Sequence, residues 1–400
     1  MDFTLTAEQQ AAKEEYDTFF EAEMKDAPEE YQKNTLEATY SSDECFEFCQ
    51  SMQKKLAEKG WLTMAWPKEF GGQDASIINQ LLFNESMAYY HAPGVDIFGM
   101  KMFAPAVMLF ATDEQKERIL TPIANGEVTY CQGWSEPNSG SDLASLKTSA
   151  IKDGDHYIVN GQKIWTTGAH RADSMFLLAR TDPTEKRGKG LSVFNVEDMR
   201  APGIDVRPIH YMNGGHMYNE VYFTDVRIHE SNLIGDENGG WAQTRATMNF
   251  ERSGVGNFVD VKHALTGLVD YCKNTNRDGK PIIENPIVRQ KIAKLYIDAE
   301  VGRALAYRCA WEQEKGNMIV STTLASESKV FGSELRQQLS YFSTEIMGLH
   351  GQLESCPWSP LDGSMADAYT WCMGGNIAAG TSEIQRNLIA WVGLGLPRFN

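Results

Sequence analysis

The sequence contains few cysteines and no long apolar run. Seven cysteines are scattered among 400 residues, and no two of them form a C-x-x-C pair. An odd, scattered set of this kind is typical of a reducing compartment. No uninterrupted apolar stretch approaches the roughly 20 residues that a membrane helix needs, and residues 1–10 are polar and acidic. We therefore expect a cytoplasmic protein without a cleaved signal or a membrane-inserted segment.

Basic residues are in the minority. The 37 Lys and Arg residues stand against 54 Asp and Glu residues, which gives a formal net charge of −17 at pH 7. Nucleic-acid binding needs concentrated Lys and Arg, so this balance argues against a nucleic-acid partner. The sequence also lacks a strand followed by G-x-G-x-x-G and a helix, which disfavours a nicotinamide-dinucleotide enzyme.

Length and pattern favour a multidomain protein. A chain of 400 residues with 42% hydrophobic content exceeds the usual size of a single core. Helical signals dominate residues 1–125, where Thr6 and Gln9 form a potential capping box and apolar side chains from Cys45 to Leu56 recur every three or four positions. The same period returns in residues 239–400, notably from Ile292 to Phe342, and predicts a bundle of long helices.

The region 126–238 reads as a β domain. Residues 156–165 consist of two short apolar runs on either side of Asn160-Gly161, and this pattern predicts a hairpin with a turn at that dipeptide. Further strands are expected at Met175–Ala179, Leu191–Val196 and Glu220–Phe223, separated by loops rich in Pro, Gly and charge. The order is therefore helical, β, helical, which makes the fold class α+β.

Three short segments carry small and hydroxyl-bearing residues in patterns that suit close approach of a ligand. They read YCQGWSEPNSGSD at 130–142, KIWTTG at 163–168 and AGTSEIQRNLI at 379–389. Taken singly, each also fits a plain structural role: a polar loop, a half-buried strand with a packing Trp, and a helix cap.

Together with NEVYFTDVRI at 219–228, these segments resemble the acyl-CoA dehydrogenase family in order and spacing over nearly the whole chain. The resemblance implies N-terminal helices, a central β-barrel-like domain and a C-terminal four-helix bundle, with boundaries at 1–125, 126–238 and 239–400. It implies an FAD-dependent oxidoreductase that acts on an acyl-CoA thioester. Because CoA is anionic and the chain is acidic, a CoA site must depend on local basic groups and helix N-termini.

The resemblance also assigns site residues. Gln132, Ser135 and Ser141 are expected at the flavin ring, its edge or the pyrophosphate, and Trp165 and Thr167 at its N5 side. Family members complete the FAD site across a subunit interface, which implies a homotetramer or heterotetramer. The matching positions here are Arg277, the turn from Gly348 to Gly351, Thr381 and Glu383. Two departures from the family pattern lie in this second group. The basic and aromatic cluster that usually follows the interfacial Arg is here RDGKP, at 277–281. A Gln often found before the Gly-rich turn is matched here by Glu345.

The catalytic base is not in its usual place. In many family members a Glu precedes the C-terminal Gly-Thr, but this position is Ala379, followed by Gly380. A smaller branch, resembling isovaleryl-CoA, long-chain and sterol-side-chain dehydrogenases, carries the Glu in a Glu-Arg pair on the first helix of the C-terminal domain. Glu251-Arg252 matches that pair, so Glu251 is the expected base. The plain alternative for the pair is a solvated ion pair on a helix.

Other assignments follow from the same resemblance. Substrate contacts are expected from Ser141, Arg252, Ala379 and Gly380. His91 and Asp96 precede a stretch that lies near the substrate in the family, so each is a candidate second acid or base, although a surface loop is the simpler interpretation.

Three functional hypotheses remain open at this point. The first is an active dehydrogenase that passes electrons to an electron-transfer flavoprotein, with a branched or alicyclic acyl-CoA as its substrate. The second is an oxygen-using oxidase or monooxygenase on the same scaffold. The third, which Ala379 motivates, is a non-catalytic partner subunit of a heteromeric dehydrogenase.

Overall fold

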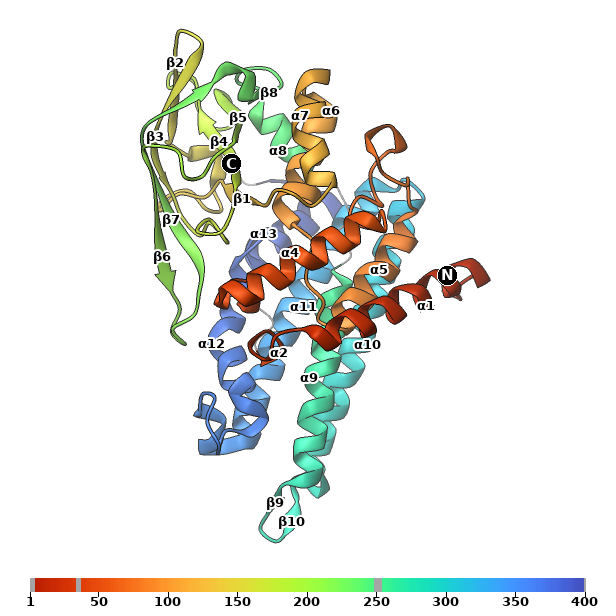
Figure 1. Ribbon diagram of the computed structural model, residues 1–400. Helices are drawn as coiled ribbons and strands as arrows, with labels where there is room; N and C mark the ends of the chain where they lie inside the picture. The colour runs from red at the N-terminus through yellow and green to blue at the C-terminus, as the bar shows by residue number, and fades with distance from the viewer. Residues whose placement is uncertain (1–3, 34–36, 248–253, 399–400) are drawn as a thin grey trace. The chain divides into compact units, whose positions relative to one another are not determined.

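The structure is a computed structural model of the chain, and it describes residues 4–33, 37–247 and 254–398. The chain packs into two compact units, and each unit is made of segments that are separate in the sequence. The helical unit lies within residues 1–34, 75–92 and 251–400, and the sheet unit within 35–74 and 93–250 (Figure 1). The division of the chain at residues 125 and 238 into three domains stays a prediction.

The helical unit is built from long antiparallel helices. Figure 1 shows α9 and α10 side by side, joined at one end by the small β9–β10 hairpin. Its α-helices are α1 (Ala7–Glu23), α2 (Glu29–Lys33), α5 (Ile77–Tyr89), α9 (Val255–Asn274), α10 (Pro286–Glu314), α11 (Met318–Met347), α12 (Ser364–Ile377) and α13 (Ser382–Leu388). The shorter elements are η1 (Met24–Asp26), β9 (Asn276–Arg277), β10 (Lys280–Pro281), η6 (Ile282–Glu284), η7 (Gly348–Gln352), η8 (Pro360–Gly363) and the π-helix η9 (Ile389–Gly393).

Helix packing in this unit depends on close approach between α9 and α10. The fully buried Phe258 of α9 lies so near Gly302 of α10 that a Cβ at position 302 would come within 2.0 Å of the Phe258 ring. Glycine is required there for the two backbones to reach this distance. The surrounding core includes Leu265, and also Leu295 and Phe342, which the apolar periodicity predicts.

Local capping sets the ends of several helices. Thr6 accepts from the backbone N–H of Gln9 and the Gln9 side chain accepts from the backbone of Thr6, so the predicted capping box is confirmed. Ser42 caps α4 by accepting from the N–H of Cys45. Thr381 caps α13 in the same manner through the N–H of Ile384.

The sheet unit combines helices with one eight-stranded sheet, ordered β6-β7-β3-β2-β4-β5-β8, with β1 pairing β4 in parallel. The strands are β1 (Tyr130–Gly133), β2 (Ser149–Asp153), β3 (His156–Lys163), β4 (Ser174–Arg180), β5 (Leu191–Val196), β6 (Ile204–His210), β7 (His216–His229) and β8 (Leu233–Ile234). The helices are α3 (Ala38–Ser41), α4 (Asp43–Glu58), α6 (Ala104–Phe110), α7 (Asp113–Ala124) and α8 (Gly240–Thr247), with 3-10 turns η2 (Lys68–Phe70), η4 (Leu143–Ser145) and η5 (Glu230–Asn232) and the π-helix η3 (Ile97–Phe103).

The predicted hairpin turn at Asn160-Gly161 is wrong. β3 runs through this dipeptide as one strand, and its pairing with β7 shifts register between Val159 and Gly161. The turn of the β2–β3 hairpin lies instead at Asp153–His156. A β-bulge needs the same permissive glycine as a turn, and only the pairing partner β7, which lies some 60 residues along the chain, distinguishes the two.

The α+β class and the helical, β, helical order are both confirmed. Among the residues that the structure describes, none of the helices combines the length and apolar character that a bilayer crossing requires.

Candidate active site

A buried ion pair joins two of the sequence motifs within the sheet unit. Lys163, at the end of β3, is fully buried, and its Nζ lies 2.9 Å from Oε1 of Glu136 and donates to the carbonyl of Trp134 at 3.0 Å. Directly beyond it, the N–H of Ile164 donates to the carbonyl of Ser135 at 2.9 Å. The segments 130–142 and 163–168 are therefore held edge to edge.

The charges of this pair are balanced by their surroundings. Burial alone would raise the pKa of Glu136, but Lys163 and the N–H groups of Lys147 and Thr148, each 2.7 Å from a carboxylate oxygen, outweigh it and lower that pKa. Burial lowers the pKa of Lys163 to about 8, although Glu136 opposes the shift. Both groups are therefore charged at neutral pH.

The motif at 219–228 is attached to the same place through Asn219 of β7. Thr166 and Asn219 exchange backbone hydrogen bonds of 3.0 and 3.1 Å, and the N–H of Gly168 donates to the carbonyl of Met217 at 2.8 Å. The side-chain amide of the fully buried Asn219 adds a 2.9 Å bond to the carbonyl of Thr166. Three segments that are far apart in the sequence thus meet at one locus.

Trp165 stands out at this locus because of its backbone. Its φ of +60° is in the left-handed region, which non-glycine residues rarely adopt. The hydrogen bonds of Ile164 and Thr166 on either side keep it there. Trp165 is 57% exposed, and its ring centroid lies 5.9 Å from that of Tyr218 in an edge-to-face arrangement. An exposed aromatic ring on a strained, over-determined backbone is typical of functional sites.

The other predicted cofactor residues of this unit lie on the same segments. Gln132 is half-buried, with its side-chain N–H donating to Sδ of Met102 at 3.4 Å. Ser135 and Thr167 are half-buried, and Ser141 is exposed.

Two buried polar atoms at this locus test whether the residues fit a cofactor. Nε1 of Trp134 and Oγ1 of Thr166 have no hydrogen-bond partner among the described residues. Buried polar groups in folded proteins nearly always have a partner, so these two donors are available to a bound molecule. Their chemistry fits the FAD that the sequence resemblance implies.

The helical unit carries the remaining predicted residues in two places. At the start of α13, Ala379 and Gly380 have φ values of +53° and +86°, and the side chain of Gln385 donates to the carbonyl of Ala379 at 3.0 Å. Thr381 then caps the helix and Glu383 is exposed in its first turn. Oγ of the adjacent, buried Ser382 has no partner among the described residues.

The second place is the end of α11. The guanidinium of Arg277 donates to the carbonyl of Ile346, directly before the turn at Gly348. Gly348 has a φ of +61°, and a Cβ at Gly351 would come within 2.9 Å of the Thr344 carbonyl. Arg277 therefore lies beside the Gly348–Gly351 turn, and its expected role at the FAD stays a prediction.

These two places are far apart along α11. Arg386 of α13 pairs with Glu334 at 2.7 Å, which anchors α13 near the middle of α11. A helix rises 1.5 Å per residue, so Gly348 lies roughly 20 Å along the axis from Glu334.

The predicted base, Glu251, and its neighbour Arg252 lie outside the described residues. His91 instead packs in the helical unit, with its ring 4.4 Å from that of His263 and its Nδ1 4.0 Å from Asp260. Burial lowers the pKa of His91. Sequence reasoning did not single out Glu136, Lys163 or Asn219; the signal for Lys163 was a charge at an inward position of an alternating strand.

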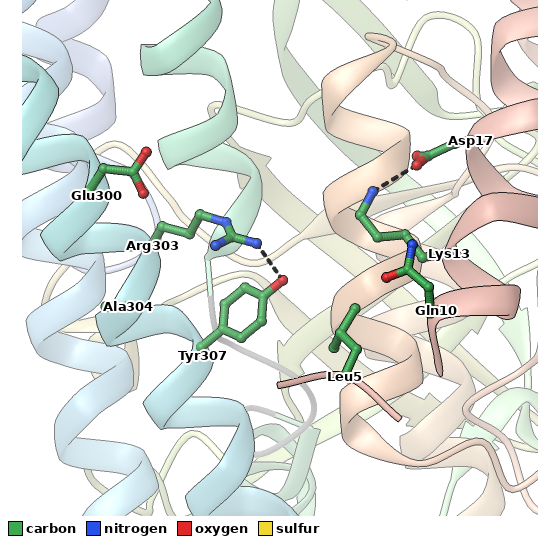
Figure 2. A pocket seen from close by; sticks show the side chains of 8 residues that line it. All are labelled: Leu5, Gln10, Lys13, Asp17, Glu300, Arg303, Ala304 and Tyr307. Atoms are coloured by element: carbon green, nitrogen blue, oxygen red, sulfur yellow. Dashed lines mark hydrogen bonds and ion pairs between the residues drawn. The ribbon is translucent and has the colours of Figure 1, made fainter. Parts of the chain in front are cut away.

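Two hollows lie away from all of these residues. A pocket of about 310 Å³ in the helical unit is lined by Leu5, Gln10, Lys13, Asp17, Glu300, Arg303, Ala304 and Tyr307 (Figure 2). Its charges are satisfied internally: Lys13 pairs with Asp17, and Arg303 and Tyr307 both bind the buried carboxylate of Glu85. A second hollow of about 500 Å³, in the sheet unit, is mainly apolar and is lined by Pro67, Glu69, Phe70, Pro105, Met108, Leu109, Asp113 and Lys116.

Comparison with known proteins agrees with the motif geometry. Domain models of acyl-CoA dehydrogenases match in order: the N-terminal domain at residues 6–127, the middle domain at 131–226 and the C-terminal domain at 238–394. Acyl-CoA dehydrogenase FadE26 of Mycobacterium tuberculosis is 35% identical over 352 residues, which cover 86% of this chain and 87% of that protein.

Solved structures give the same result. The crystal structure of the ChsE4–ChsE5 complex from Mycobacterium tuberculosis matches with a TM-score of 0.87 and 32% identity, covering 100% of both chains. The Tcur3481–Tcur3483 steroid ACAD matches with a TM-score of 0.88 and 28% identity, again over 100% of both chains. Since these likenesses span all three regions and agree with the joined motifs, the chain belongs to the acyl-CoA dehydrogenase family, whose members are FAD-dependent flavoproteins.

Proposed function

We propose that this oxidoreductase converts an acyl-CoA thioester to the 2-enoyl-CoA, with Glu251 as the base. The observation that carries the assignment is Ala379, which leaves no carboxylate at the usual position before the Gly-Thr of α13. Glu251 belongs to the Glu-Arg pair that bears the base in one branch of the family. A base need only reach the α hydrogen, so either helix can supply it.

Each proposed site residue has its own role in the reaction. Glu251 takes the α proton, and Arg252 contacts the substrate or orients Glu251. Ser141, Ala379 and Gly380 line the thioester region, where backbone N–H groups can bind an oxygen that gains negative charge. Bound FAD supplies the two-electron acceptor for the hydride that leaves the β carbon.

The sheet unit offers one face for the flavin. Gln132 and Ser135 on the first motif and Trp165 and Thr167 on the second are held edge to edge by the Glu136–Lys163 pair. We assign these residues to the flavin ring and its N5 side, and Ser141 to the pyrophosphate side.

The helical unit offers two further sets of contacts. Thr381 and Glu383 lie at α13, whereas Arg277, Gly348 and Gly351 lie at the far end of α11. Since one helix separates these sets by roughly 20 Å, we propose that each FAD contacts α13 of one subunit and the Arg277 region of another, in a homotetramer or heterotetramer. Two structural relatives are themselves complexes of two named chains.

The substrate class is proposed as a branched or alicyclic acyl-CoA. The position of the base supports this, and one structural relative is described as a steroid ACAD. An electron-transfer flavoprotein is the proposed acceptor, and the cytoplasm the proposed location.

The test is anaerobic reduction of the flavin by a panel of straight, branched, cyclic and dicarboxylic acyl-CoA thioesters. Glu251→Gln should bind FAD and thioester normally and be reduced about 10²- to 10⁴-fold more slowly, the usual contribution of a general base. Glu284→Gln, an exposed acid of the same unit, is the control and should behave as wild type. Normal reduction of Glu251→Gln would remove the assignment.

A second candidate follows from the same Ala379. If the wild-type chain binds FAD but no thioester reduces it until a second chain is added, the protein is a partner subunit of a heteromeric dehydrogenase. An oxygen-using enzyme is distinguished by mixing the reduced protein with air, since a dehydrogenase should keep its flavin reduced for longer.

A further inference from the structure

Asp96 is an acidic side chain that the proposed chemistry does not use. It lies in the sheet unit, directly before the π-helix η3 (Ile97–Phe103), and the residue is partly exposed while protein atoms surround its carboxyl group. Oδ1 accepts from the N–H groups of Phe98 and Gly99 at 3.0 and 3.1 Å. Oδ2 accepts from the N–H of Tyr130 in β1 at 2.9 Å.

These bonds connect two elements that are separated in sequence. Two donors belong to the first turn of η3 and the third belongs to β1, the strand that carries Gln132. The approach is close: a Cβ at Gly99 would come within 2.3 Å of Oδ2 of Asp96 and 2.9 Å of the Tyr130 ring. Glycine at 99 is therefore required for this carboxylate to reach both elements.

The other contacts between η3 and β1 depend on the same alignment. At the end of η3, Phe103 packs on Tyr130 and Phe176, with ring centroids 5.1 and 5.0 Å apart. Met102 receives the side-chain N–H of Gln132 on its Sδ. A π-helix is an uncommon element that occurs frequently at functional sites, and its wide turn needs outside support.

The electrostatic environment of Asp96 is acidic. Burial raises its pKa to about 6, against the three N–H donors that lower it, and Asp173 raises it further. Tyr40 of α3 and Tyr130 and Cys131 of β1 share this environment: burial raises the pKa of each, and Asp96 raises it further. These neighbours are all acids, so backbone dipoles stabilise the carboxylate.

We propose that Asp96 is a positioning residue, whose carboxyl group holds the π-helix Ile97–Phe103 against strand β1 and thereby keeps Gln132 in place for flavin reduction. The inference rests on the proposed function, which puts Gln132 at the flavin. The three converging N–H groups use acceptor lone pairs on both carboxyl oxygens. An amide at position 96 has one acceptor oxygen and places its own N–H groups among these donors, so it loses at least one of the three bonds.

The effect of pH on the contacts of Asp96 follows from its raised pKa. The pKa of Asp96 is higher in the folded chain than in the unfolded chain, where it is near 3.9. Its contribution to the free energy of unfolding is therefore fully present below the unfolded value and is lost as the pH rises through about 6. The closed arrangement binds the proton more tightly than an arrangement in which Asp96 is exposed to water, so acidification should strengthen the contact between η3 and β1.

The experiment uses the FAD-loaded protein from pH 5 to 8 and two readouts. The first is the rate of anaerobic flavin reduction at saturating acyl-CoA. The second is hydrogen exchange, measured by mass spectrometry on peptides that cover residues 96–103 and 128–133 and corrected for the intrinsic effect of pH. Wild type should gain protection in these peptides below about pH 6. Asp96→Asn should be about 10-fold slower at pH 8 with little change in KM, should be less protected than wild type at that pH, and should show no inflection of protection near pH 6.

Asp155→Asn, an exposed acid on the β2–β3 turn, is the matched control and should keep the wild-type profile. Wild-type protection that does not change between pH 5 and 8 would overturn the proposal, as would wild-type rate and protection in Asp96→Asn. If no thioester reduces the wild-type flavin, the proposed function fails, whereas the exchange readout still tests the role of Asp96 in the fold.

Discussion

At the scale of single residues, Glu136 and Lys163 decide how the segments 130–142 and 163–168 meet. Removing charges from water is costly, and it is offset here by a 2.9 Å contact and by N–H or carbonyl partners for both groups. The carboxylate and the ammonium also lie on different motifs, so the pair specifies which backbone segments are adjacent.

Lys163→Met tests this pair. Breaking a buried ion pair from one side costs about 3–5 kcal/mol, and the lower end is expected because Glu136 keeps the N–H groups of Lys147 and Thr148. Chemical denaturation of the apoprotein measures the loss. The double variant Glu136→Gln/Lys163→Met should regain part of the stability, since no uncompensated charge remains.

The control for this experiment is Lys152→Met, which breaks the Lys152–Glu230 pair at 2.9 Å on the surface of the same sheet. Exposed pairs contribute little, so its denaturation midpoint should match wild type. If Lys163→Met matches wild type as well, the buried pair does not hold the motifs together.

At the scale of elements, the segment Trp165–Gly168 is held against strand β7 by hydrogen bonds, several of them from Asn219. Oδ1 of Asn219 accepts from Nε2 of His216 at 2.8 Å, and Nδ2 faces the carbonyl of Thr166 and Nδ1 of His170. This arrangement requires a neutral His170. Burial, the stacked His216 and Arg171 lower the pKa of His170 to about 4, so the network persists at neutral pH.

Asn219→Ala should loosen this segment without unfolding the sheet. Loss of its bond to the Thr166 carbonyl alone costs about 1–1.5 kcal/mol, which corresponds to a roughly 10-fold weaker binding of FAD by the segment that we assign to the flavin. Titration of the apoprotein with FAD gives the affinity. Asn160→Ala removes comparable bonds to Asp225 on the outer part of the same strands and should bind FAD as wild type does. Equal affinity for both variants would contradict the role of Asn219.

At the scale of the whole molecule, the separation of the two sets of proposed FAD contacts on the helical unit predicts sites that two chains share. Arg277→Ala alone should weaken FAD binding by about 10-fold, because a charged hydrogen-bond partner is removed from the cofactor. Oligomers that mix Arg277→Ala chains with Glu251→Gln chains give a sharper result.

At an FAD concentration that is limiting for Arg277→Ala, each single variant should have low activity, yet co-expressed in equal amounts they should recover about a quarter of the wild-type activity. This follows because a random pair then combines an intact Glu251 from one chain with an intact Arg277 from the other in about one site in four. Flavin reduction by the best thioester measures the recovery. No recovery in verified mixed oligomers would show that each site belongs to one chain.

Local sequence was enough to determine the elements whose signals lie within a few residues. The cap at Thr6, the periodic stretch from Cys45 to Leu56, and the order of helical and β regions all appear in the structure as predicted. Capping and amphipathic periodicity depend on contacts between near neighbours, so they can be recognised without knowledge of the fold. The four motifs and their order also identified the family and its cofactor.

Only the tertiary structure decided features that depend on distant partners. Asn160-Gly161 became a bulge because β7 pairs across it, and Asp96 became a support for η3 because β1 presents an N–H to it. Lys163 reads as an isolated charge until Glu136, 27 residues away, is placed beside it. Such contacts lower the free energy only after the chain has brought both partners together, so neither partner's local sequence records the other.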